Sequence, residues 1–275
     1  MKKHLITIAF ILGAIITLSV LLYPAVADLV NSRKQTNIVM SYLDDVAAMD
    51  ESSKQEMLDA ATEYNERLLH KPNRFKSTAE EEAEYQRQLD TGRGVMGVLE
   101  IDKIGVKLPI YHGTDEGVLQ VGLGHMPSTS LPVGGAGTHA FITGHRGLPS
   151  SKLLTNLDRM AEGDIFILHI LSDILTYQVD EIKTVLPDDA KAIGIDSDMD
   201  CCTLVTCTPY AVNTHRLLVR GHRIENAAVF TMPETDAHRL DRVLVLPLFL
   251  LPVLLVLLVF AIARCIKISK GGKAK

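Results

Sequence analysis

The chain has 275 residues, of which 47% are hydrophobic and 22% are charged, and its mean hydropathy is +0.17. A disordered chain is more polar than this, and a cytosolic domain rarely has a positive mean hydropathy. The formal net charge is −5, but all 33 acidic residues and only 21 of the 28 basic ones lie between Asp28 and Arg242, which gives this segment a charge of −12. We therefore expect no nucleic acid among its partners.

Two uncharged segments, residues 5–27 and 243–263, are each long enough to cross a bilayer, which takes about 20 apolar residues. The tail at 264–275 carries five basic residues and no acidic one. The positive-inside rule then places both this tail and residues 1–4 in the cytoplasm, and the acidic domain outside the cell membrane. An alternative for the first segment is a cleaved signal peptide, because Ala25-Val26-Ala27 fits a cleavage site. Its length favours an uncleaved anchor in contact with membrane lipid.

Residues 28–92 form a predicted helical region. Apolar residues recur at helical spacing between Thr36 and Leu69. Asp50–Ser53 interrupts this pattern, and Ser53 with Glu56 would form a capping box at the start of a second helix. A short third helix is expected within Glu80–Gln88.

After Gly92 the pattern changes to short apolar runs separated by turn residues, which is typical of strands. The predicted strands are Val95–Ile101, Val106–Tyr111, His139–Thr143, Asp164–Leu171, Leu175–Val185, Thr203–Thr208 and Arg216–Ile224. So many strands with little helix between them favour a closed β-barrel over residues 93–226, with 227–242 as a linker to the second span.

Three polar residues stand at ends of predicted strands and together suit acyl transfer. Cys207 is a potential nucleophile, because nearby cations favour a reactive thiolate. His145 is able to carry a proton to or from a leaving group near neutral pH. Arg216 keeps its charge and suits a developing oxyanion or the positioning of a substrate.

Each of these residues also has a structural interpretation. A cysteine in an apolar strand is often a small buried hydrophobic residue, and an arginine at a strand end often forms a weak surface ion pair. Cys201, Cys202, Cys207 and His215 could instead bind zinc, but their spacing lacks the usual C-x2-C pattern. We expect no metal and no cofactor, and structural roles for Cys201 and Cys202.

The segment Thr203–Pro209 reads Thr-Leu-Val-Thr-Cys-Thr-Pro and resembles the TLxTC signature of sortases, the cysteine transpeptidases of Gram-positive cell surfaces. Its continuation to Gly221 is similar to the class C, pilus-assembling branch. Further similar segments are Leu108–Thr114, Thr129–Gly135 and Thr143–Pro149. These motifs keep the family's order over roughly Met96 to Ile224.

The resemblance implies an eight-stranded sortase barrel with Cys207 as nucleophile, His145 as general acid/base and Arg216 as the stabilising arginine. Thr206, through its side chain or the amide that follows it, is expected to help bind the oxyanion. The implied reaction cleaves an LPxTG-like sorting signal of a pilin through a thioester. A lysine amine of the next pilin then resolves the thioester to an isopeptide bond.

Class C enzymes usually cover the cleft with a lid that carries an aspartate and an aromatic residue. The matching segment lies near residues 71–76, with Asn73 at the position of the aspartate and Phe75 as the aromatic residue. An amide forms no charge-assisted pair with an arginine, so we expect a looser lid. Alternatively, Phe75 packs against the barrel and the segment is no lid.

Two other functions remain open at this point. The chain could be a cysteine peptidase that releases the acyl group to water, or a scaffold that binds pilin without cleaving it. The candidate specificity segment is Leu186–Asp200, whose acidic residues suit a basic substrate, although an exposed acidic loop is the commoner explanation.

Overall fold

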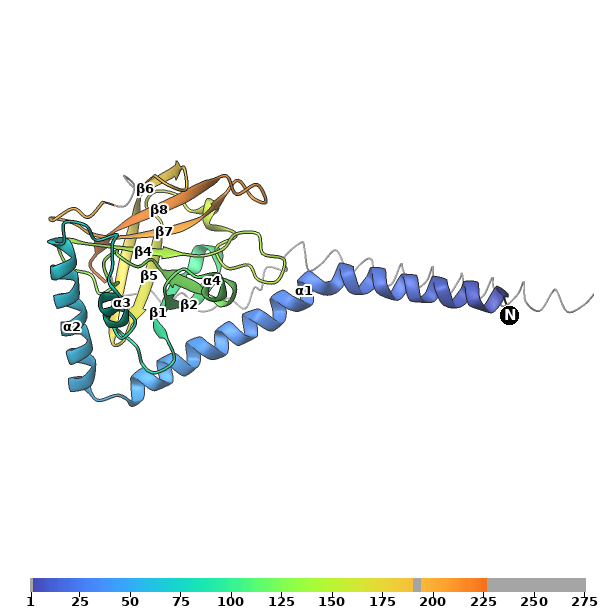
Figure 1. The fold of residues 1–275 in the computed structure, drawn as a ribbon, viewed down its shortest axis with the longest axis horizontal. Helices are drawn as coiled ribbons and strands as arrows, with labels where there is room; N and C mark the ends of the chain where they lie inside the picture. The colour runs from blue at the N-terminus through green and yellow to red at the C-terminus, as the bar shows by residue number, and fades with distance from the viewer. Residues whose placement is uncertain (1, 190–193, 227–275) are drawn as a thin grey trace, which may run out of the picture. The chain divides into compact units, whose positions relative to one another are not determined.

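The computed structural model describes residues 2–189 and 194–226 (Figure 1). The second predicted span, at 243–263, lies outside these residues. In chain order the elements are α1 (Lys2–Ala48), α2 (Glu51–Leu69), α3 (Ala79–Tyr85), β1 (Val95–Ile101), the 3-10 helix η1 (Asp102–Ile104), β2 (Val106–His112), α4 (Glu116–Val121), β3 (Leu123–His125), β4 (Thr138–Thr143), the 3-10 helix η2 (Leu157–Arg159), β5 (Ile165–Ile170), β6 (Asp173–Val185), β7 (Asp200–Thr208) and β8 (His215–Ile224).

The eight strands form a closed barrel in the order β1-β2-β3-β4-β7-β8-β6-β5, which confirms the predicted fold class. Two pairs are parallel, β2 with β3 and β4 with β7, and the others are antiparallel. The long β6 and β8 lie next to each other (Figure 1). Strand β7 therefore lies between β4 and β8, although β4 precedes it by more than fifty residues in the chain.

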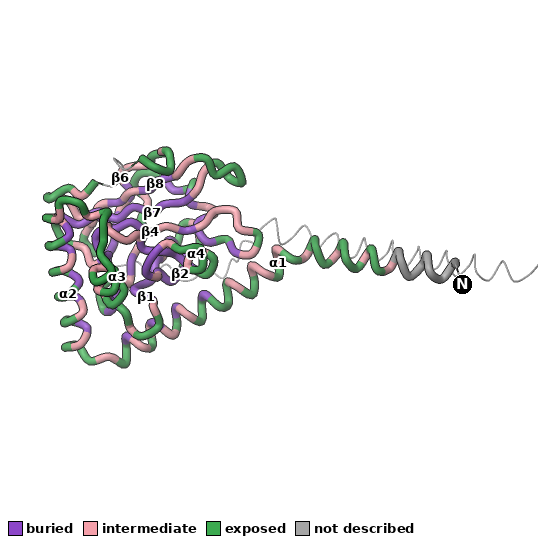
Figure 2. The backbone as a smooth tube through the Cα atoms, viewed as in Figure 1, coloured by how far each residue is buried: buried purple, intermediate pink, exposed green. Residues whose placement is uncertain are grey.

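Alternating side chains fill the barrel. On β7, Cys202 and Leu204 are fully buried in the main core, whereas Val205 belongs to a separate small cluster with Phe141 and Leu218. Successive residues of a strand point to opposite faces, so this division separates the inside of the barrel from its outer face. Buried segments follow the strands in Figure 2. The positions of Cys202 and Cys207 on opposite faces agree with the strand alternation.

Helix α1 is longer than predicted, because it runs without a break through Asp28–Gln35. Within Ile11–Ala48 it is long and apolar enough to cross a membrane. Its C-terminal turns pack against the barrel, where the Tyr42 hydroxyl accepts a hydrogen bond from Leu171 N at 2.8 Å and donates one to Met96 O at 3.3 Å.

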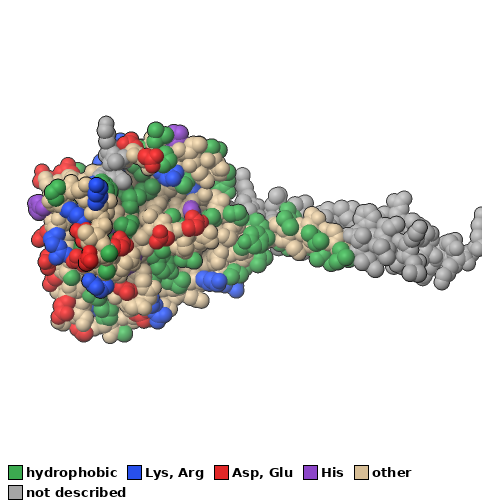
Figure 3. Space-filling view, viewed as in Figure 1, with side chains coloured by type: hydrophobic (Ala, Val, Ile, Leu, Met, Phe, Trp, Pro, Cys, Tyr) green, Lys and Arg blue, Asp and Glu red, His purple; other side chains and the backbone are tan. Residues whose placement is uncertain are grey.

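Helix α2 begins three residues earlier than the predicted capping box. Its N-cap is Asp50, whose carboxylate accepts hydrogen bonds from the amide and hydroxyl of Ser53. The prediction of Ser53 as the cap was therefore wrong, because an aspartate three residues upstream satisfies the same free N–H groups. A capping box does occur on α3, between Thr78 and Glu81. The face with α2 and α3 carries mixed acidic and basic side chains (Figure 3).

A buried polar cluster joins α3 to β3. The Tyr85 hydroxyl lies 3.0 Å from Nδ1 of His125, and Nε2 of His125 lies 2.8 Å from Ser130 O. Since a carbonyl only accepts, Nε2 donates to it, and Nδ1 is left as an acceptor. The Tyr85 hydroxyl shares its single proton between Nδ1 and the backbone carbonyl of His125, both 3.0 Å away. Burial is the main cause that lowers the pKa of His125 to about 4.

We expect the protein to lose stability as the pH falls from 7 to 4. The unfolded chain takes up a proton on His125 near the ordinary pKa of about 6.5, whereas the folded protein does not until about pH 4, so the loss grows between these values. Between pH 7 and 4 the free energy of unfolding should fall by about 3 kcal/mol. Urea unfolding of the wild type and of His125→Asn across this range measures it. An equally steep pH dependence in the variant would contradict this origin.

Candidate active site

Cys207 is the last residue but one of β7, and it is directly opposite Arg216 of β8 in the antiparallel register. Residues that are opposite each other in such a pair present their side chains on the same face. Cys207 is a free, half-buried cysteine, in contrast to the buried Cys201 and Cys202. The thiol and the guanidinium therefore lie on one face at one end of the barrel.

His145 reaches the same end through the parallel pairing of β4 with β7. The amide of Gly144 donates to Val205 O at 3.0 Å, and the Thr206 hydroxyl donates to Gly144 O at 2.8 Å. A Cβ atom at Gly144 would lie 2.6 Å from a methyl carbon of Leu123 and 3.0 Å from one of Leu154, so a larger residue here would displace these buried side chains. These contacts fix the backbone before His145 against the backbone before Cys207.

Thr206 holds the loop of His145 rather than facing the thiol. Its side chain is 1% exposed, and its hydroxyl gives its single proton to the carbonyl of Gly144. The side chain is thus not free to donate to an oxyanion in this structure. The other predicted donor, the backbone amide that follows Thr206, belongs to Cys207 itself.

The two arginines on the outer face of β8 have different partners. Arg220 forms a bidentate pair with Asp180, at 2.9 and 3.2 Å, and a further contact with Glu181 at 3.3 Å. Arg216 donates only to backbone carbonyls, those of Asn213 and His215, at 3.3 and 3.2 Å. Within the described part of the chain Arg216 has no carboxylate partner, so its charge is available to a ligand.

A groove with a cavity volume of about 220 Å³ begins beside Arg216. Val205, two residues before Cys207, forms part of its floor together with Phe141 and Leu218. Val185, the last residue of β6, and Leu186, the first of the β6–β7 connection, line one side. An apolar floor next to a thiol and an arginine suits an extended peptide with aliphatic side chains.

The sequence did not point to Glu116, an acidic residue near His145. Glu116 opens the unpredicted helix α4, and its Oε2 lies 3.5 Å from Nε2 of His145. The pKa of Glu116 is lowered mainly by a hydrogen bond from Gln120 and then by His145. A six-residue helix has too short an apolar pattern to be recognised, and an acidic residue in a turn carries no signal of its own.

The structure places the candidate lid segment near the opposite end of β4. The Phe75 side chain is 53% exposed, and the Arg74 guanidinium lies 4.9 Å from the centre of its ring. Arg74 is one of the charges that lower the pKa of His139, after burial as the main cause. Neither Asn73 nor Phe75 is among the residues that line the groove beside Arg216. A lid function for this segment stays a prediction.

Comparisons with known proteins point to one family. A family model described as the sortase domain matches residues 99–224. The chain is 28% identical over 138 residues to sortase D of Bacillus subtilis and 31% identical over 145 residues to sortase A of Streptococcus agalactiae. These matches cover 49% and 51% of this chain, and only 66% and 58% of those two relatives.

Solved structures match over a larger part of the chain. Sortase C1 from Streptococcus agalactiae is 48% identical with a TM-score of 0.66, and the match covers 70% of this chain and 100% of that one. Sortase C from Streptococcus pneumoniae is 42% identical with a TM-score of 0.61, and the match covers 68% and 96%. The chain belongs to the sortase family of cysteine transpeptidases, and sortase C enzymes are among its structural neighbours.

Proposed function

We propose that this protein is a membrane-anchored sortase of class C that cleaves LPxTG-like sorting signals and joins pilin subunits through lysine isopeptide bonds. The proposal is supported by the pairing of Cys207 with Arg216 across β7 and β8, and by the hydrogen bond from Gly144, the residue before His145, to Val205 on β7. Arg216 also lines the apolar groove. Two structural neighbours point to pilin: one is described as sortase C1 of a pilus island, and another through its pilin substrate specificity.

The first half of the reaction forms a thioester. The thiolate of Cys207 attacks the carbonyl carbon of the threonine in the sorting signal, and Arg216 stabilises the charge that develops on the oxygen. The carbon–nitrogen bond then breaks, and His145 gives a proton to the departing glycine amine. The acyl group stays on the sulfur.

The second half transfers the acyl group to an amine. A lysine amine of the next pilin attacks the thioester carbon and passes a proton to His145. The carbon–sulfur bond breaks, the thiolate of Cys207 is regenerated, and an isopeptide bond has formed. Every proton released in one half is used in the other, so these side chains need no further reagent.

Anchoring fits the same proposal. The apolar part of α1 would hold the protein in the cell membrane, and a second span at 243–263 would place both termini in the cytoplasm. The acidic domain would then lie outside the cell, where pilin subunits are assembled.

One experiment separates this function from its rivals. The full-length protein in detergent is incubated with an LPxTG-type peptide, with and without a pilin domain that carries the acceptor lysine. We expect a thioester on Cys207 by mass spectrometry, and an amide-linked product when the lysine is supplied. A thioester that only hydrolyses would favour a peptidase, and the absence of any thioester would leave only a binding scaffold.

A further inference from the structure

On the outer face of the barrel, a second cavity extends the groove away from Cys207, toward the start of β7. Three neighbouring strands each present a row of alternate side chains to this face. The rows are Thr143, Phe141 and His139 on β4, Val205, Thr203 and Cys201 on β7, and Arg216, Leu218 and Arg220 on β8. The first part of each row lines the groove beside Arg216, and the later part lines a second cavity of about 530 Å³. Leu218 lines both cavities, so the two are neighbours on one floor.

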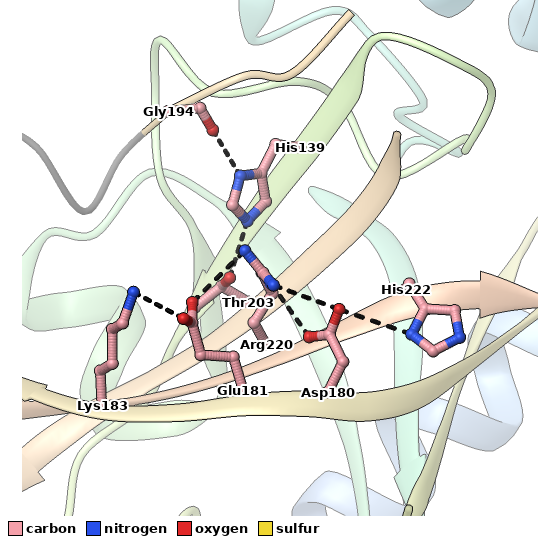
Figure 4. A network of polar contacts seen from close by, with 8 residues as sticks. All are labelled: His139, Asp180, Glu181, Lys183, Gly194, Thr203, Arg220 and His222. Atoms are coloured by element: carbon pink, nitrogen blue, oxygen red, sulfur yellow. Dashed lines mark hydrogen bonds and ion pairs between the residues drawn. The ribbon is translucent and has the colours of Figure 1, made fainter. Parts of the chain in front are cut away.

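The floor of the second cavity is polar, and hydrogen bonds and ion pairs connect its side chains (Figure 4). The ring of His139 donates through Nδ1 to the carbonyl of Gly194 and accepts through Nε2 from the Thr203 hydroxyl, 2.7 Å away. Its centre is 4.4 Å from that of Phe141, so the polar floor joins the apolar one directly. Beside it, Glu181 lies between Lys183 and Arg220, at 2.6 and 3.3 Å.

One wall of the second cavity comes from the connection before β7. Gly194, Asp196 and Ser197 line it. The contact from His139 to Gly194 holds one end of this wall, and hydrogen bonds from the amides of Gly137 and Thr138 to Met199 O hold the other. The wall is therefore attached to β4 at both ends.

The combined groove is longer than the sorting signal. Cys201 lies six residues before Cys207 on β7, which is about 20 Å along a strand. The four residues of an LPxT segment span about 13 Å when extended. Two or three further residues of the substrate would thus lie over the second cavity.

The direction of the substrate follows from the positions of His145 and Arg216. The leaving amine takes its proton from His145, which does not line the groove, whereas Arg216, which would stabilise the acyl oxygen, does line it. The part of the substrate that precedes the scissile bond then lies along the groove, and the part that leaves does not.

The charges favour a basic side chain in the second cavity. Lys183 and Arg220 are both paired with carboxylates. Asp196 on the wall has no ion pair within the described ranges 2–189 and 194–226. The carboxylate of Asp196 accepts only the amide of Asp198, at 3.1 Å, so among the described lining residues the charge that lacks an opposite charge is negative.

Resting on the proposed function, we propose that this second cavity binds the pilin residues just before the sorting signal and favours a basic one there. An LPxTG pentapeptide would fill only the apolar half of the groove. The polar half would select among pilins that share the same sorting signal.

The test compares three substrates on the full-length protein, with one amine acceptor throughout. They are the pentapeptide LPxTG, and the same peptide preceded by three residues that begin with Lys or with Glu. We expect the Lys extension to raise kcat/KM about tenfold over the pentapeptide, mainly by lowering KM. The kcat/KM of the peptide with the Glu extension should be at least about threefold below that of the peptide with the Lys extension. The variant Asp196→Lys should reverse this preference, whereas Asp198→Lys, on the same loop but outside the cavity, should keep it.

The outcomes separate the inference from the function on which it rests. Turnover of the pentapeptide with no gain from either extension would overturn the second cavity as a substrate site, and leave the sortase function intact. An equal gain from residues added after the glycine would overturn the assigned direction. A preference for Lys that survives Asp196→Lys would overturn the role of the wall. No turnover of any peptide would refute the proposed function as well.

Discussion

The variant Cys207→Ala is expected to lose turnover of a sorting peptide by roughly four orders of magnitude or more, because the other thiol that the described residues present on this face, Cys201, lies about 20 Å away along β7. The expected measurement is the absence of an acyl adduct in the intact mass, together with the loss of product. The barrel should be unchanged, since Cys207 lies at the end of β7 and outside the core.

Cys202→Ala is the matched control. Its thiol is fully buried in the core, and burial raises its pKa well above the ordinary range. This variant should keep its thioester and most of its turnover while losing some stability. An acyl adduct on the Cys207→Ala protein would refute the assignment of the nucleophile.

The variant Arg216→Lys is expected to lower kcat/KM by about two to three orders of magnitude although the charge is kept. A lysine lacks the planar fork that holds an oxyanion in a fixed direction, and the loss of one such donor commonly has this effect. Steady-state kinetics with the pentapeptide and one fixed amine measures the change. The loss should fall mainly on kcat, because the interaction forms in the transition state.

Arg223→Lys is the control for this change. Arg223 is on the same strand but outside the groove, where it donates to Thr176 O and Asn226 and lies over the Tyr177 ring. The same substitution there should leave kcat within about twofold of the wild type. A wild-type rate for Arg216→Lys would show that this arginine does not stabilise the transition state.

Much of the barrel was predictable because its strands are long enough to show their pattern. Seven predicted strands agree with the structure within three residues at each end. The missed strand, Leu123–His125, has only three residues and exists because β2 and β4 pair with it on both sides. A pairing between distant segments leaves no periodic signal in so short a segment.

Local chemistry explains the other differences. One continuous helix joins the predicted first span to the helical pattern that starts at Thr36, because the intervening residues Asp28–Gln35 are compatible with a helix and some of them have tertiary partners. Gln35, for example, donates to Val121 O at 3.2 Å and to the Ser151 hydroxyl at 3.1 Å. Sequence alone shows a polar stretch but not the barrel surface on which it lies.

The candidate site was predictable in its residues but not in its surroundings. The motif around Cys207 and the strand-end positions of His145 and Arg216 are visible in the chain. The involvement of Thr206 with the Gly144 carbonyl, the approach of Glu116 and the second cavity all depend on contacts between segments that are distant in the sequence. Such contacts become visible only once the order of the strands is known.

The parallel pairing of β4 with β7 has a consequence for the time at which the enzyme becomes active. Phe141 and its partner Thr203 are 62 residues apart, and contacts of such long range form slowly because the intervening chain must first be ordered. Cys207 and Arg216 are only nine residues apart on consecutive strands and pair locally, whereas the segment of His145 reaches Cys207 only when β4 and β7 pair. We expect catalytic competence to appear late in folding, so that a chain in which β4 and β7 have not yet paired carries its thiol without the histidine that would complete the site.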